Sequence, residues 1–135
     1  MEKRVLHIAP EDTVKAVQEK FSSWYPYLKI NFFRNINGKG SSQPCFGPEV
    51  RMGDINKNLQ NSNYELQDHT SVAGLEKIFG DIFGLPIQVS RRSGNLWLET
   101  KLTDHLTLKE QNIIGEEISD APYKTLPFTL IPYGC

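Results

Sequence analysis

The sequence holds few of the residues that carry chemistry. Among its 135 residues are two cysteines and three histidines, with no C-x-x-C, H-x-x-x-H or H-E-x-x-H motif. A zinc site draws its ligands from closely spaced pairs of these residues, so we expect no metal and no cofactor. Cys45 and Cys135 are the only cysteines, and so few in a chain of this length indicate free thiols in a reducing compartment.

Long apolar runs are also missing. No stretch approaches the length of a membrane span, and the first ten residues contain no apolar segment typical of a secretory signal. We therefore expect a soluble, cytoplasmic protein with no membrane partner. The formal net charge of −1 gives no general attraction to nucleic acid or to an anionic membrane.

Motifs of nucleotide binding and of nucleophilic catalysis are absent as well. The segment from Gly38 to Ser41 offers glycines and a lysine but lacks the spacing of a phosphate-binding loop. Cys45 has no neighbouring base in the sequence, and no G-x-S-x-G occurs. These absences favour a protein that is not an enzyme.

What the sequence does contain is the same structural pattern twice. Residues 6–34 and 64–92 share one order of apolar, polar and turn residues at a shift of 58 positions, from Leu6 to Tyr64. Each stretch has strand spacing, then helical spacing, then strand spacing again, which predicts two β-α-β passes. The first six matched pairs are Leu6/Tyr64, Ile8/Leu66, Val14/Val72, Val17/Leu75, Phe21/Phe79 and Trp24/Ile82.

Local signals place the remaining elements. Ser93-Gly94-Asn95 predicts a hairpin turn leading into a strand of alternating residues from Leu96. Thr107 and Glu110 fit a capping box, which predicts a third helix through Ile118. We also expect a short strand at 49–52 and an extended tail over 119–135.

These elements predict one α+β domain over residues 1–135. If the two crossings bring their strands together in parallel, both helices cover one face of a common sheet. That arrangement is a two-layer sandwich of ferredoxin-like type, extended by a hairpin strand and a C-terminal helix. A β-grasp fold is the alternative.

The proposed binding surface follows from alternation along the strands. Consecutive apolar residues such as Phe32 and Phe33 place apolar bulk on both faces of the sheet, so one face needs a cover. Helix, tail or another chain could provide that cover. We therefore expect a non-enzymatic binding or assembly module whose partner is a protein, either a second copy or another chain. Its predicted binding residues are Phe33, Arg34, Arg91, Arg92 and Trp97.

Two other functions stay open. Asp104 and His105, near Arg92, could line a pocket of a ligand-binding domain or small enzyme, because an aspartate can orient and activate a histidine. Alternatively, Phe33 and Trp97 could stack single-stranded bases. Nucleic acid is disfavoured because the RNA-recognition motif is missing and the net charge is slightly negative.

Overall fold

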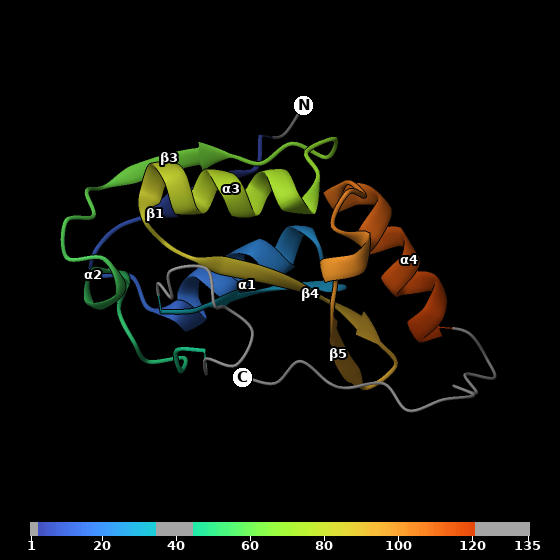
Figure 1. Ribbon diagram of the computed structural model, residues 1–135. Helices are drawn as coiled ribbons and strands as arrows, with labels where there is room; N and C mark the ends of the chain where they lie inside the picture. Colours follow the sequence, from blue (N-terminus) through green and yellow to red (C-terminus); the bar gives the residue numbers. More distant parts are fainter. Residues whose placement is uncertain (1–2, 35–44, 121–135) are drawn as a thin grey trace.

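The computed structural model describes residues 3–34 and 45–120. Within them the chain forms a small α+β fold with two antiparallel sheets (Figure 1). The elements are β1 (Val5–Ile8), α1 (Val14–Trp24), β2 (Leu28–Phe32), α2 (Met52–Ile55), β3 (Ser62–Glu65), α3 (Val72–Phe83), β4 (Ile87–Ser93), β5 (Leu96–Glu99), a 3₁₀ turn (Lys101–Thr103) and α4 (Leu108–Asp120). No helix among these residues is long and apolar enough to cross a membrane.

The sheet topology differs from the one the sequence predicts. β1 pairs with β3, while β2, β4 and β5 form a second sheet, and every pairing is antiparallel. The two strands of each crossing therefore lie in different sheets, so the expected common parallel sheet is wrong. The ferredoxin-like and β-grasp arrangements each place their strands in one sheet, whereas the described strands form two.

Side chains of α1 occupy the edge of β2 that β1, the other strand of the same β-α-β pass, would need for pairing. Gln18 donates its side-chain Nε2–H to the Ile30 carbonyl at 2.7 Å, and the Ser22 hydroxyl donates to the Leu28 carbonyl at 2.8 Å. Two polar side chains one turn apart on α1 thus occupy the carbonyls that a neighbouring strand would use. β2 then takes its strand partner, β4, on the other side.

Both predicted β-α-β passes are present, and their helices begin in the same way. The Thr13 side chain accepts the Ala16 N–H at 3.1 Å, and the Ser71 side chain accepts the Gly74 N–H at 2.9 Å. These N-caps lie 58 positions apart, the shift read from the sequence, and each satisfies an otherwise unpaired donor of the first turn.

The correspondence extends beyond the passes to the helix that follows each. Val14 donates its N–H to the Val50 carbonyl at 2.8 Å, and Val72 donates its N–H to the Leu106 carbonyl at 3.0 Å. The segment before α2 therefore accepts a hydrogen bond from the start of α1. In the same way, the segment before α4 accepts one from the start of α3. The strand expected at 49–52 is absent: Arg51 forms only an isolated bridge with Thr13, and α2 begins at Met52.

One apolar core joins the two sheets and α1 and α3. Val14 and Val72 are 1% and 0% exposed, as their place on the predicted helix stripes requires. Ile82 departs from the prediction: it is 70% exposed, and Phe83 takes the buried place in the last turn of α3. In Figure 1, α3 runs between β3 and β4, and α4 stands at the far end of the second sheet.

α4 buries one leucine together with polar and small residues, and none of its isoleucines is fully buried. Its buried residues are Leu108, Gln111, Gly115 and Ser119. Ile113, by contrast, is 41% exposed. The capping box is confirmed, because Thr107 and Glu110 exchange side-chain to backbone bonds at 2.9 and 3.0 Å.

Cys45 forms a disulfide bond, so the expectation of a free thiol is wrong at this position. Disulfides persist mainly in oxidising compartments. The cysteine content therefore no longer favours a cytoplasmic location. The expected tail over 119–135 lies outside the described residues from position 121 onward.

We expect an added methyl group to change the free energy of unfolding in opposite directions at two glycines. A Cβ on Gly115 would lie 2.7 Å from the Cβ of Tyr27, whereas a Cβ on Gly80 would meet nothing within 4 Å. Gly115→Ala should lower the free energy of unfolding by about 1–3 kcal/mol. Gly80→Ala should raise it by about 1 kcal/mol through helix propensity alone.

Urea unfolding of both variants beside the wild type measures these changes. Equal shifts in the same direction would contradict the close approach of α4 to Tyr27.

Candidate functional site

The predicted binding residues do not gather on one surface. Phe33 is 7% exposed and its N–H donates to the Pro86 carbonyl at 2.9 Å, so its ring is not available to a partner. Arg34 is exposed, and its guanidinium carbon lies 5.1 Å from the ring centroid of Phe46, a cation–π distance. The ring of Phe33 is thus buried, although the sequence places it on the predicted binding surface.

Arg91 and Arg92 point to opposite faces of β4. Arg91 donates to the Gln111 Oε1 on α4 at 2.9 Å, and burial lowers the pKa of its guanidinium. Arg92 is exposed on the other face, where it stands directly opposite Trp97 in the strand register. Of the two arginines, only Arg92 therefore belongs to the surface around Trp97.

Trp97 is partly exposed and carries a cation on its ring. The Lys29 Nζ lies 5.8 Å from the Trp97 ring centroid. Lys29 and Trp97 belong to β2 and β5, and only the register through β4 brings them to one face. Sequence reasoning missed Lys29 for that reason, although its alternation with apolar neighbours placed it on a polar face.

β5 is the edge strand of its sheet among the described elements. Ser93 and Leu96 close the two-residue hairpin, and such a closing pair exchanges both backbone bonds. By alternation, Trp97 and Glu99 direct their N–H and C=O groups away from β4. These four groups face outward in the described part of the chain, and their neighbour Leu96 is 38% exposed. The side chain of Leu102, just past the strand, is 94% exposed.

Asp104 and His105 do not form the expected pair in a pocket. Asp104 lines a cavity of about 80 Å³, while His105 is exposed and is not among its lining residues. Arg92 does not line it either. The cavity is lined by Glu76, Gln88, Val89, Glu99, Thr100, Lys101 and Asp104.

Glu76 is the perturbed group of this cavity, and sequence reasoning missed it. Its Oε2 accepts the Val89 N–H at 3.0 Å, while Thr100 donates its hydroxyl to the Val89 carbonyl at 2.7 Å. Burial raises the pKa of Glu76 to about 7, and the nearby Asp104 adds to this rise. The helix residue 58 positions earlier is Gln18, which also binds a strand edge but as a donor, to the Ile30 carbonyl of β2. Glu76 therefore serves the edge of β4 beyond the end of β5.

The raised pKa of Glu76 predicts a pH-dependent stability. Its neutral carboxyl contributes fully below the ordinary pKa of 4.5, and this contribution is lost as pH rises through about 7. Glu76→Gln keeps an oxygen for the Val89 N–H but cannot ionise. We expect the variant to exceed the wild type at pH 8 by about 1–3 kcal/mol in free energy of unfolding.

Urea unfolding between pH 4 and pH 8 measures this difference, which should shrink toward zero at the acid end. Glu117→Gln, at an exposed position of α4, is the control. A pH-independent difference between Glu76→Gln and the wild type would contradict this account.

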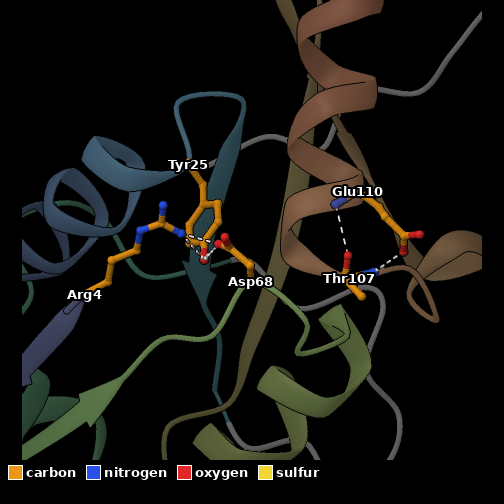
Figure 2. A network of polar contacts seen from close by, with 5 residues as sticks. All are labelled: Arg4, Tyr25, Asp68, Thr107 and Glu110. Atoms are coloured by element: carbon orange, nitrogen blue, oxygen red, sulfur yellow. Dashed lines mark hydrogen bonds and ion pairs between the residues drawn. The ribbon is translucent and has the colours of Figure 1, made fainter. Parts of the chain in front are cut away.

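A second polar cluster joins the residue before β1, the residue after α1 and the loop after β3 (Figure 2). Arg4 donates to the Tyr25 hydroxyl at 3.1 Å and pairs with Asp68, and Tyr25 donates to Asp68 at 2.8 Å. Burial and the bond to Asp68 raise the pKa of Tyr25 to about 12, and the Tyr25 bond lowers the pKa of Asp68. The adjoining open cavity of about 360 Å³ includes Lys3 and His69. Because its charged groups already satisfy one another, we read this cluster as structural.

The described residues include no group of three or more His, Cys, Asp or Glu side chains placed to hold a metal ion. Comparison with protein-family models found no match, and neither the curated proteins nor the solved structures compared with the chain gave a similar one.

Proposed function

We propose that the protein is a non-enzymatic binding module that takes an extended segment of another polypeptide along the open edge of β5. The outward backbone groups of Trp97 and Glu99 carry this proposal. An incoming strand would pair with them and extend the sheet of β2, β4 and β5 by one strand.

The side chains around this edge fit a polypeptide strand. Partly exposed Leu96 and Leu98 flank one face, which suits apolar residues of the partner. Trp97 with Lys29 and Arg92 flanks the other face, which suits aromatic or acidic residues. Backbone pairing supplies affinity in this mode, and alternate side chains supply specificity.

The other two functions have weaker support. A ligand or enzyme site at Asp104 and His105 has weak support because Asp104 lines the cavity and His105 does not. Base stacking on the sheet is predicted to use the rings of Phe33 and Trp97, but the ring of Phe33 is buried. A cytoplasmic location remains a prediction from the sequence.

A proline at position 99 tests the proposal. Glu99→Pro removes an outward N–H without removing a bond to β4, a placement that edge strands tolerate. A random linear-peptide phage library is selected on the wild-type chain, and the selected peptides are measured against Glu99→Pro and Glu99→Gln. We expect Glu99→Pro to lose at least about tenfold in affinity, the equivalent of one or two backbone hydrogen bonds. Glu99→Gln should bind like the wild type.

Circular dichroism and urea unfolding check that Glu99→Pro keeps its fold. Selected peptides that bind both variants equally, or a library that yields no binder, would overturn the proposal.

A further inference from the structure

Another open strand edge in the described part of the chain belongs to β1. The N–H of Leu66 donates to the Arg4 carbonyl at 2.8 Å, which fixes the alternation of the β1–β3 ladder. Residues one and three positions after Arg4 then turn their backbone groups away from β3. Val5 and His7 thus direct N–H and C=O groups toward the side on which α1 lies.

A groove of about 180 Å³ runs along this edge. α1 and the turn before it form the opposite wall, where Asp12, Ala16 and Lys20 follow one another at intervals of one helical turn. Ala16 is exposed and small, which leaves the middle of the groove open, and Val17 is 2% exposed beneath it. The lining residues are Val5, His7, Asp12, Ala16, Val17 and Lys20.

The groove has an acidic end and a basic end. Asp12 lies beside the end of β1, where its Oδ2 accepts the Ala9 N–H at 2.9 Å. Because α1 turns back along β1 after this short connection, Lys20 lies two helical turns away, at the Val5 end. A bound chain would therefore meet a carboxylate near the C-terminal end of β1 and an ammonium near its N-terminal end.

The corresponding place in the second pass shows that the fold alone does not make this groove. At a shift of 58 positions, Asp12, Ala16 and Lys20 correspond to Thr70, Gly74 and Ile78. The side chain of Ile78 packs against the core instead of standing at the rim as Lys20 does. The open, doubly charged groove is thus particular to the residues of the first pass.

We infer that this groove binds an extended peptide of another protein as an added strand antiparallel to β1. Its backbone pairs with Val5 and His7, and a small side chain lies over Ala16. A basic residue toward its N-terminus meets Asp12, and an acidic residue toward its C-terminus meets Lys20. The antiparallel direction follows because antiparallel pairing is the more stable. The inference does not depend on the β5 edge.

Two sets of synthetic heptapeptides test the site and its direction. Both sets are acetylated and amidated so that their termini carry no charge. One set places a basic residue before and an acidic residue after a varied centre of small and apolar residues; the other has the same composition in reverse charge order. Binding to the full chain is measured by fluorescence anisotropy, and the best binder is mapped by amide shifts in nitrogen-15 spectra.

We expect the basic-to-acidic set to bind, with shifts centred on Val5 and His7. Lys20→Glu should weaken this binding about tenfold, the scale of one lost charge pair, while Lys15→Glu on the same helix should leave it unchanged. Ala16→Leu should abolish binding by filling the groove, whereas Glu19→Leu should not.

Equal binding of the two peptide sets, no binding by either, or insensitivity to Ala16→Leu would overturn the inference. Shifts centred on Trp97 and Glu99 would also overturn it while supporting the β5 edge. Binding at Val5 and His7 that persists in Glu99→Pro would support this groove independently of the proposed function.

Discussion

The antiparallel pairing of corresponding strands holds the two halves of this chain together. β1 pairs with β3 and β2 pairs with β4, so each pass supplies one strand to each sheet. Neither pass could bury its own apolar residues alone, because the strands that complete its sheets come from the other pass. The shared core of Phe21, Ile30, Phe79 and Val89 follows from this exchange.

This pairing also decides which strand edges need another partner. On β2, Gln18 and Ser22 occupy the carbonyls of the free edge, and on β4 Glu76 and Thr100 hold Val89 beyond the end of β5. Helix and turn side chains thus do for these strands what a neighbouring strand would do. The outward groups of β1 and β5 have no such side chains in the described residues, and both proposed peptide sites lie along these edges.

The second pass resembles the first but differs where the chemistry lies. Gln18, an uncharged amide, corresponds to the partly buried acid Glu76, so the pH dependence of stability that we predict belongs to the β4 edge alone of the two. Lys20, a charged residue at the rim of the β1 groove, corresponds to Ile78, which packs against the core. The two passes therefore share one order of secondary-structure elements but present different surfaces. The reason is that corresponding helix positions carry a polar residue in one pass and an apolar residue in the other.

Local chemistry allowed the sequence by itself to determine the elements of this protein. The helical spacing of Val14, Val17 and Phe21, the hydroxyl caps, and the Gly94 turn act over a few residues, so the passes, the hairpin and the capped third helix are confirmed. Strand partners, the burial of Phe33, the divergence of Arg91 and Arg92, and the neighbours of Glu76 were decided by the tertiary structure alone. Each depends on which of several equally suitable edges meet across the core, and that choice rests on contacts between residues dozens of positions apart.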